Sequence, residues 1–140
     1  MEKDCKCGEK MALKLRTVIF QSRVEIENVP IFTCPSCNRS SVFPPVKPDL
    51  SRLIQSFGDK PDKQQVFFNE ANELSFLMCK ASDKRYIDMP IEVIIQDRIN
   101  ELLDMLLLCQ SLGDVEWIDD TRHRLAQITE HMSTAYDFHN

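Results

Sequence analysis

The sequence predicts an α+β fold, with a small β-sheet at its start and a mainly α-helical part that ends in an antiparallel hairpin. Residues with β-branched side chains alternate between two close pairs of cysteines in residues 1–43. Three prolines follow within residues 44–48, where they favour a stiff, extended connector. Apolar residues then recur at helical spacing. These observations predict a sheet domain at 1–43, a linker at 44–48 and a helical domain at 49–140.

The composition and charge of the chain limit the classes of protein to which it can belong. The 140 residues are 43% hydrophobic and 28% charged, which is typical of a globular chain. A run of about 18 apolar residues is absent and the first ten residues do not resemble a secretory signal, so we expect a cytoplasmic protein with no membrane span. Lys and Arg number eight against five Asp and Glu in residues 1–48, but nine against seventeen in residues 49–140. This balance favours protein partners over a broad nucleic-acid surface.

Two strands are predicted at residues 11–20 and 23–28, with Gln21-Ser22 as the turn between them. A third short strand at 30–33 leads into the second cysteine pair.

The middle of the chain is predicted to be helical. Asp49 is placed to cap a short helix with apolar residues at helical spacing, and Gly58 is placed to end it. Residues 61–87 contain both strand-like alternation and i, i+4 spacing, and we interpret them as helix.

The last third gives the clearest pattern. Asp88 and Pro90 are start signals for a helix at 91–112, whose apolar residues recur at spacings of three and four. Gly113-Asp114 ends this helix and caps a second one that continues to near the end, so the two are predicted to form a hairpin. Additional leucines widen the apolar face of the 91–112 helix, and we expect it to support a homodimer.

The cysteines at the start carry the chemistry. Cys34-Pro35-Ser36-Cys37 has the spacing of a zinc knuckle, and Asn38 can adopt the left-handed conformation that closes it. Cys5 and Cys7 are one residue closer together, and Gly8 stands where such a turn needs a positive φ. We therefore predict one structural Zn²⁺ ion bound by Cys5, Cys7, Cys34 and Cys37. Four thiolates leave a zinc ion no open position, so we expect no enzyme.

The reactive residues allow other interpretations, which the sequence favours less. A redox C-x-x-C normally lies at the start of a helix, whereas Cys34 precedes a segment that is unlike a helix. Cys79 and Cys109 are isolated, and Cys109 lies on an apolar face where a cysteine packs as a small hydrophobe. His123, His131 and His139 are interpreted as surface residues. Trp117 is interpreted as a packing residue, with a half-buried contact point as the alternative.

The first 43 residues resemble the YgiT-type zinc fingers, including the N-terminal domain of the MqsA antitoxins, through Cys5, Cys7, Val29-Pro30 and Cys34-Pro35-Ser36-Cys37. The resemblance implies a two-knuckle ribbon. In the antitoxins a helix-turn-helix DNA reader follows, and this sequence offers no such segment. The C-terminal part is similar to the short IDEAL motif, through Gly113-Asp114, Glu116-Trp117, Thr121 and Leu125, and to the UVR hairpin of McsA-type zinc proteins. These likenesses imply a helical module that contacts proteins.

The function expected from these patterns is that of a non-enzymatic zinc-binding adaptor or regulator acting through protein contacts. The alternative is an antitoxin-like transcriptional regulator, with Lys14, Arg16, Arg23, Arg39 and Lys47 contacting DNA phosphates. A thiol or zinc sensor is a further alternative, because the short Cys5/Cys7 spacing could release metal on oxidation.

Overall fold

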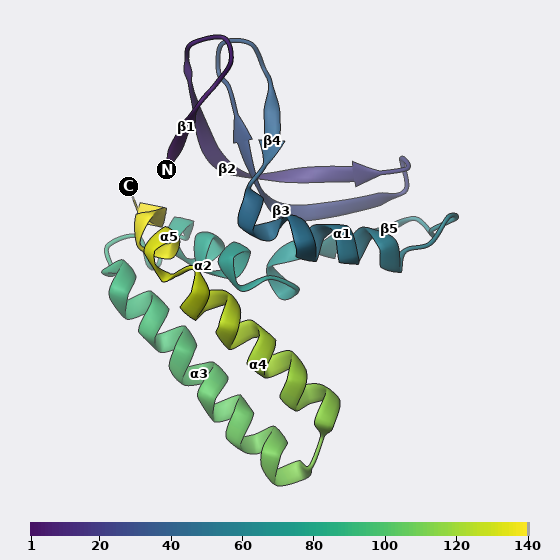
Figure 1. Cartoon of the computed structure of the whole chain (residues 1–140), viewed down its shortest axis with the longest axis vertical. Helices are drawn as coiled ribbons and strands as arrows, with labels where there is room; N and C mark the ends of the chain where they lie inside the picture. Colours follow the sequence, from purple (N-terminus) through teal and green to yellow (C-terminus); the bar gives the residue numbers. More distant parts are fainter. Residues whose placement is uncertain (140) are drawn as a thin grey trace. The chain divides into compact units, whose positions relative to one another are not determined.

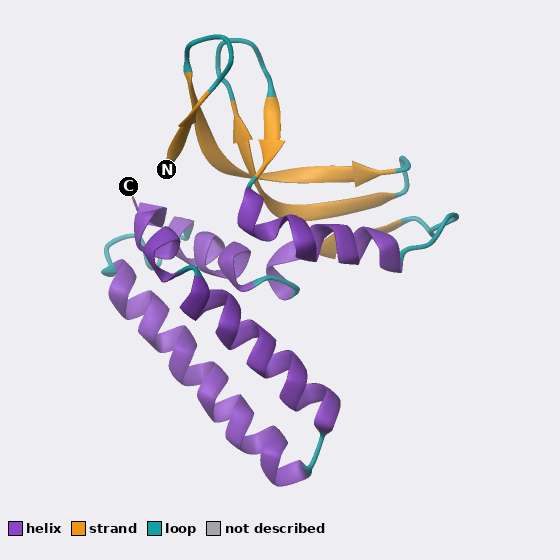
Figure 2. Ribbon diagram, viewed as in Figure 1, coloured by secondary structure: helices purple, strands orange, loops and turns teal. Residues whose placement is uncertain are grey.

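The computed structural model describes residues 1–139, so residue 140, the last of the predicted helical domain, lies outside the described residues. The α+β class is confirmed, with a curled sheet first and helices after it (Figure 2). Contacts divide the chain into two units, Met1–Cys79 and Lys80–Asn140. This division falls within a helix, well beyond the prolines at 44–48. Independent folding of residues 1–43 remains a prediction.

The first unit is built on a five-stranded sheet. Four strands follow the order β1-β2-β3-β4 and pair antiparallel, while β5 pairs parallel with the first half of β3 (Figure 1). Their bounds are β1 Glu2–Asp4, β2 Lys10–Phe20, β3 Val24–Thr33, β4 Ser40–Val42 and β5 Gln64–Phe67. The buried apolar residues of these strands and of the segments after them include Val24, Ile26, Val29, Phe32, Phe43, Val46 and Phe68.

The long hairpin of β2 and β3 follows from alternation and from its turn. Gln21 and Ser22 both have positive φ, 51° and 57°, and the Arg23 N–H donates to the Phe20 carbonyl at 3.1 Å. Such a turn matches the right-handed twist of the strands it joins. The predicted turn is therefore confirmed.

The strands predicted at 23–28 and 30–33 form one strand, β3, that contains Pro30. The Pro30 carbonyl accepts a hydrogen bond from Phe43 at 3.1 Å, so its nitrogen also faces the side of β4 and β5. Strand β5 pairs with residues 24–27 and β4 with residues 31–33, which leaves Pro30 between the two partners. No amide donor is needed at that point, and the strand continues through the proline.

The prolines at 44–48 form a helical start instead of an extended connector. Pro44–Val46 is a short 3₁₀ turn, and α1, Lys47–Ser56, begins directly after it with Pro48 in its first turn. The fixed φ of proline suits the first turn of a helix, where amide donors lack partners in any case. The helix predicted here is confirmed, but Asp49 lies inside its first turn and does not cap it. Asp49 is buried and accepts a hydrogen bond from the Asn72 side chain at 2.9 Å.

The prediction of helix throughout residues 61–87 is partly wrong. Gln64–Phe67 is strand β5, a 3₁₀ turn follows at Phe68–Glu70, and only Glu73–Ser82 is the α-helix, α2. The i, i+4 pattern of the segment is consistent with α2. Strand β5 forms because it pairs with β3, which lies far away in the sequence. The local spacing of apolar residues does not reveal such a pairing.

The second unit contains the predicted hairpin of α3, Ile91–Leu112, and α4, Val115–Glu130 (Figure 1). Gly113 has φ 67° and ends α3, and the Asp114 side chain accepts from the Trp117 N–H at 3.1 Å to cap α4. Leu102 and Cys109 on α3 and Thr121 and Ile128 on α4 are buried.

The second hairpin helix ends earlier than predicted. The backbone departs from helical geometry at His131, and a separate short helix, α5, spans Met132–Tyr136. Within residues 1–139 there is no helix that combines the length and apolar character needed to cross a membrane.

Candidate metal centre

The first cysteine pair lies in the tight turn between β1 and β2. The Gly8 N–H donates to the Cys5 carbonyl at 3.0 Å, and the Cys5 N–H donates to the Glu9 carbonyl at 2.8 Å. Gly8 has φ 96°, a conformation that costs residues with a Cβ atom but not glycine. The predicted role of Gly8 is confirmed. The turn places Cys5 and Cys7 at the end of the sheet where β3 ends and β4 begins.

The second pair lies in the turn between β3 and β4. The Cys34 N–H donates to the Arg39 carbonyl at 2.9 Å, and the Asn38 N–H donates to the Cys34 carbonyl at 3.1 Å. Asn38 has φ 60°, as predicted, because asparagine tolerates the left-handed region better than most residues. Both turns are therefore held by their own backbone hydrogen bonds.

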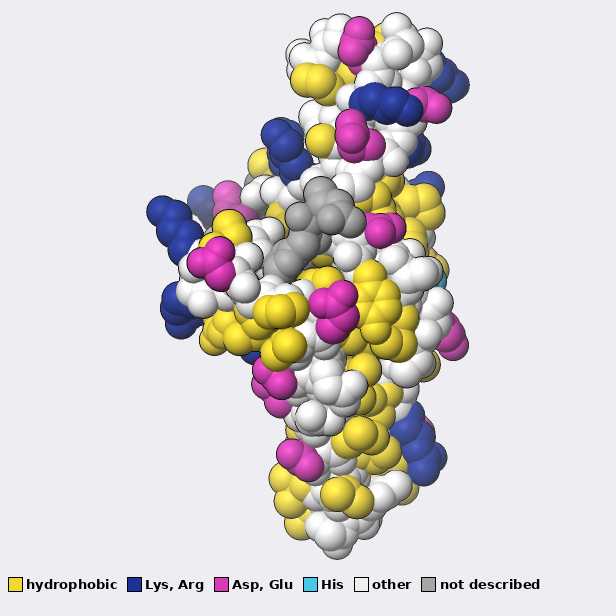
Figure 3. All heavy atoms as spheres, turned by 90° about the vertical axis from the view of Figure 1, so that its left-hand side faces the viewer, with side chains coloured by type: hydrophobic (Ala, Val, Ile, Leu, Met, Phe, Trp, Pro, Cys, Tyr) yellow, Lys and Arg dark blue, Asp and Glu magenta, His cyan; other side chains and the backbone are white. Residues whose placement is uncertain are grey.

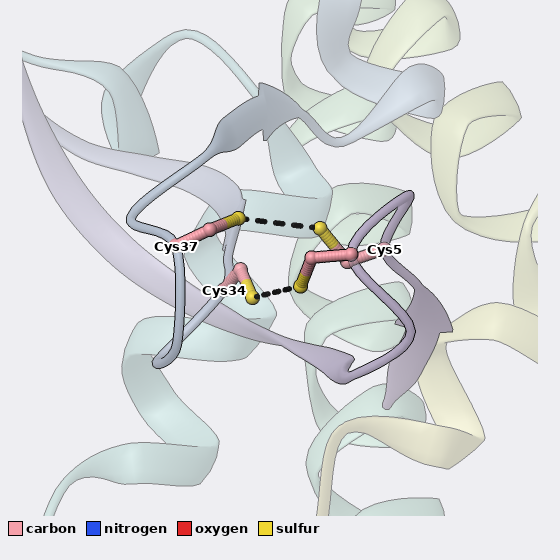
Figure 4. Close-up of side chains that lie close together, drawn as sticks. Cys5, Cys34 and Cys37 are labelled. Carbon is pink, nitrogen blue, oxygen red and sulfur yellow. Dashed lines mark hydrogen bonds between the residues drawn. The ribbon is translucent and has the colours of Figure 1, made fainter.

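The sheet brings the two turns together, so that all four sulfur atoms lie within 4.8 Å of one another. The Sγ atoms of Cys5 and Cys37 are 3.6 Å apart, and those of Cys7 and Cys34 are 3.5 Å apart (Figure 4). A tetrahedral ion with bonds of about 2.3 Å separates its ligands by roughly 3.8 Å. A disulfide would need about 2.05 Å. The cluster therefore has the size of a site for one metal ion.

The short sulfur contacts also distinguish the cluster from a redox pair. Each of them joins one turn to the other, Cys5 to Cys37 and Cys7 to Cys34. A redox C-x-x-C forms its bond within one turn and draws its reactivity from a helix N-terminus. Here Cys34 follows a strand, and the segment after Cys37 leads into β4.

Burial divides the four ligands into two kinds. Cys5 and Cys34 are buried, with Cys34 wholly inaccessible, whereas Cys7 and Cys37 are exposed. The cluster thus lies at the surface, with one buried and one exposed cysteine from each turn. An ion held by all four sulfurs would have no vacant position for a substrate.

The surroundings shift the pKa values of two of the thiols in opposite directions. The backbone N–H of Cys37, helped by that of Ser36, lowers the pKa of Cys34 to about 7 despite burial. For Cys7 the backbone N–H of Glu9 favours the thiolate, but the thiols of Cys34 and Cys5 outweigh it and raise the pKa to about 12. Four thiolates this close repel one another, and a bound cation removes that repulsion.

The other candidate residues lie elsewhere. Cys109 is buried in the hairpin, where its Sγ lies 3.3 Å from the Leu106 carbonyl oxygen. Burial raises the pKa of the half-buried Cys79 thiol. His123 and His131 do not belong to the cysteine cluster, and the side chain of His139 lies outside the described part of the chain. Trp117 is half-buried in the first turn of α4.

A groove of ≈ 420 Å³ lies beside the cluster, and sequence reasoning missed it. It is lined by Cys5 and by three cations, Lys3, Lys6 and Arg39. Asp4 also lines it, but its carboxylate forms an ion pair with Lys10 at 2.5 Å. The sequence signal for this groove is that Lys6 lies between Cys5 and Cys7 and Arg39 lies two residues after Cys37.

A comparison of the whole chain with known proteins found no matching family model, no matching curated protein and no matching solved structure.

Proposed function

We propose that Cys5, Cys7, Cys34 and Cys37 hold one structural Zn²⁺ ion. The observation that carries this proposal is the convergence of four sulfurs within 4.8 Å, with spacings close to those of a tetrahedral thiolate site. Tetrahedral sulfur ligands suit zinc and iron. Elemental analysis of the purified chain tests the assignment: one zinc per chain supports it, and an iron site with visible absorption would contradict it.

The proposed ion has a folding role. A ribbon of about 43 residues buries too little apolar surface to be stable alone, and structural zinc contributes about 10 kcal/mol or more in comparable peptides. The resemblance to YgiT-type zinc fingers agrees with this role. In this proposal the metal fixes the shape of a surface and does not take part in a reaction.

We propose that the chain is a non-enzymatic adaptor or regulator that acts through contacts with another protein. Two features support it. The thiolate site has no open position, and within residues 1–139 the four cysteines form the one group of three or more candidate metal ligands. The helical hairpin also keeps large apolar side chains on its surface, including Leu107 and Leu112.

Affinity capture tests the adaptor proposal. The zinc-loaded chain is compared with a double variant, Cys34→Ser and Cys37→Ser, and with Cys79→Ser as a matched cysteine control outside the cluster. We expect a specific partner to be retained by the wild type and by the control but lost from the double variant. Equal capture by all three would show that the ribbon plays no part in partner binding.

The groove beside the cysteines favours a second candidate function, DNA binding by a regulator. Lys3, Lys6 and Arg39 face the same groove and have the charge needed for phosphate contacts. A gel-shift titration at several salt concentrations tests it, because phosphate contacts give a steep loss of affinity with salt. Binding that is absent at low salt would exclude this candidate.

A further inference from the structure

The second half of β2 is an open edge of the sheet. Strand β1 pairs only with residues 10–12 of β2, and no strand of the described part of the first unit pairs with residues 14–20 on the side away from β3. Figure 2 shows this stretch as the upper margin of the long hairpin. The far side of β3 differs, because β4 and β5 cover it. An open edge is a row of main-chain donors and acceptors with which another strand can pair.

Hydrogen bonds fix which residues present their main-chain groups at this edge. The Leu13 N–H donates outward, to the Met1 carbonyl at 3.2 Å, whereas the Phe20 carbonyl accepts from Arg23 across the hairpin at 3.1 Å. Peptide groups alternate between the two sides of a strand. The register shift between β2 and β3 places the extra residue on β3, so the alternation continues along β2. The N–H and C=O groups that point away from β3 therefore belong to Leu15, Thr17 and Ile19.

Side chains at this edge combine apolar and positively charged surface. Ile19 is 63% exposed and shares one face of the strand with the half-buried Leu15. Lys14 and Arg16 are exposed on the other face, two residues apart, and neither forms an ion pair within residues 1–139. Figure 3 shows other Lys and Arg side chains at the surface of the upper end, which the sheet forms. The open edge is therefore apolar on one face and locally positive on the other.

We propose that this edge of β2 takes up an extended acidic segment of the protein partner as an added strand, an inference that rests on the adaptor function proposed above. The segment has acidic residues at the positions that face Lys14 and Arg16. Its apolar residues stand at the alternate positions, where they cover Leu15 and Ile19. Main-chain hydrogen bonds supply the affinity, and the two cations select the charge of the incoming strand.

A second copy of this chain fits the edge less well. An antiparallel pairing of two β2 strands about Leu15 sets Lys14 directly against Arg16. A pairing about Thr17 places the two Arg16 side chains on the same face as diagonal neighbours. A pairing about Ile19 runs past the end of β2. Cations on an edge strand discourage pairing between copies, and they leave the edge open to a strand of the opposite charge.

A model peptide tests the proposal with the full zinc-loaded chain. The probe has about eight residues that alternate valine and glutamate, enough to span an ordinary strand, and its binding is measured by fluorescence anisotropy. Thr17→Pro removes one outward N–H, a change that an edge strand tolerates. Thr17→Val is the matched control, because it keeps that N–H and loses the same hydroxyl group, which donates to Glu27. A valine–lysine peptide of the same length controls for charge.

Two modified forms of the peptide test whether binding uses the main chain. One carries N-methyl groups on its valines and the other on its glutamates, so each lacks the N–H donors of one side of an extended strand. Pairing at an edge should tolerate one form and reject the other. Amide exchange measured by NMR gives a second readout. The bound peptide should slow exchange at Thr17 and Ile19 but not at Val18, whose N–H already faces β3.

We expect Thr17→Pro to bind the valine–glutamate peptide at least about tenfold more weakly than Thr17→Val, which corresponds to about 1.4 kcal/mol. The double variant Lys14→Gln, Arg16→Gln should weaken binding and reduce its salt dependence. Its matched control is Lys84→Gln, Arg122→Gln, which removes the same charge from exposed positions in the second unit and should bind like the wild type. Circular dichroism and zinc content should be unchanged in all variants.

Three binding results overturn the proposal: equal affinity of Thr17→Pro and Thr17→Val, equal binding of the valine–lysine peptide, or equal effects of the two N-methylated forms. Sedimentation that shows a dimer abolished by Thr17→Pro also overturns it and assigns the edge to a second copy. Partner capture that depends on Cys34 and Cys37 while the peptide fails to bind would leave the adaptor function standing and move its contact surface elsewhere.

Discussion

Serine substitutions at Cys34 and at Cys37 should lower metal affinity by similar amounts but affect the metal-free protein differently. Both sulfurs belong to the cluster, so each variant loses one of four thiolates. In the metal-free protein the two positions differ, because Cys34 is wholly buried whereas Cys37 is exposed. The pair of variants therefore separates ligation from packing.

The expected magnitudes follow from these surroundings. Structural zinc contributes about 10–16 kcal/mol in small zinc domains, and serine is a poor ligand for it. One of four thiolates then represents about 3 kcal/mol, which is roughly a hundredfold in zinc affinity. Without metal, Cys34→Ser places a more polar hydroxyl at a wholly buried position and should cost about 1 kcal/mol or more. Cys37→Ser should change the metal-free stability by less than about 0.5 kcal/mol.

Competition with a chromophoric chelator measures zinc affinity, and urea denaturation in excess chelator measures metal-free stability. Ser36→Ala is the matched control, because Ser36 is exposed in the same turn and is not a ligand. Wild-type zinc affinity in Cys37→Ser would refute the four-sulfur site. Equal metal-free stabilities of the two serine variants would refute the packing part of the reasoning.

Three further results are expected. Iodoacetamide at pH 8 should modify Cys79 and Cys109 slowly with or without metal, because Cys109 is buried and burial raises the pKa of Cys79. Mass spectrometry measures the labelling, and fast labelling of either cysteine would contradict this prediction. Asp114→Ala should remove the cap of α4 and cost about 1 kcal/mol, seen as a lower melting temperature of the helical signal. The hydrogen bonds and charge of Arg85 lower the pKa of Asp83 to about 2 from an ordinary 3.8. Any stability from this pair is therefore complete above pH 3.8 and is lost as the pH falls through about 2. An NMR titration of the Asp83 carboxyl with a midpoint near 3.8 would refute this shift.

The cysteine cluster could be predicted from sequence because each half of it is a local structure. A turn that presents two sulfurs needs a residue of positive φ close to the second one, and Gly8 and Asn38 supply it within a few residues. The hairpin of α3 and α4 is local in the same sense, since Gly113 and Asp114 end one helix and begin the next. Both features depend on residues that are close together in the sequence, so their turn and cap residues can be recognised there.

The features that could not be predicted depend on pairing across long distances in sequence. Strands β1 and β4 have three residues each, too few for a periodic pattern, and they form because the sheet edge is available. Strand β5 pairs with a segment about 40 residues earlier, from Gln64 to Val24. Asp49 resembles a helix cap by sequence, but the preceding proline turn starts the helix earlier and leaves the carboxylate to bind Asn72.

The negative charge of the proposed metal centre weakens the case for DNA binding by the first part of the chain. Residues 1–48 have three more Lys and Arg than Asp and Glu, and four thiolates around a divalent ion reduce that surplus to about one. If Lys3, Lys6 and Arg39 all contact phosphates, the logarithm of affinity should fall with the logarithm of salt with a slope of about −3, since each contact gives about −0.9. Specific binding through the groove should keep that slope with zinc bound and lose about one unit of it in Arg39→Gln. Chelation removes the ion, lets the thiolates take up protons and makes the ribbon more positive. DNA affinity that rises on chelation would therefore reflect general attraction to a partly unfolded basic segment, and it would count against a folded DNA-reading ribbon.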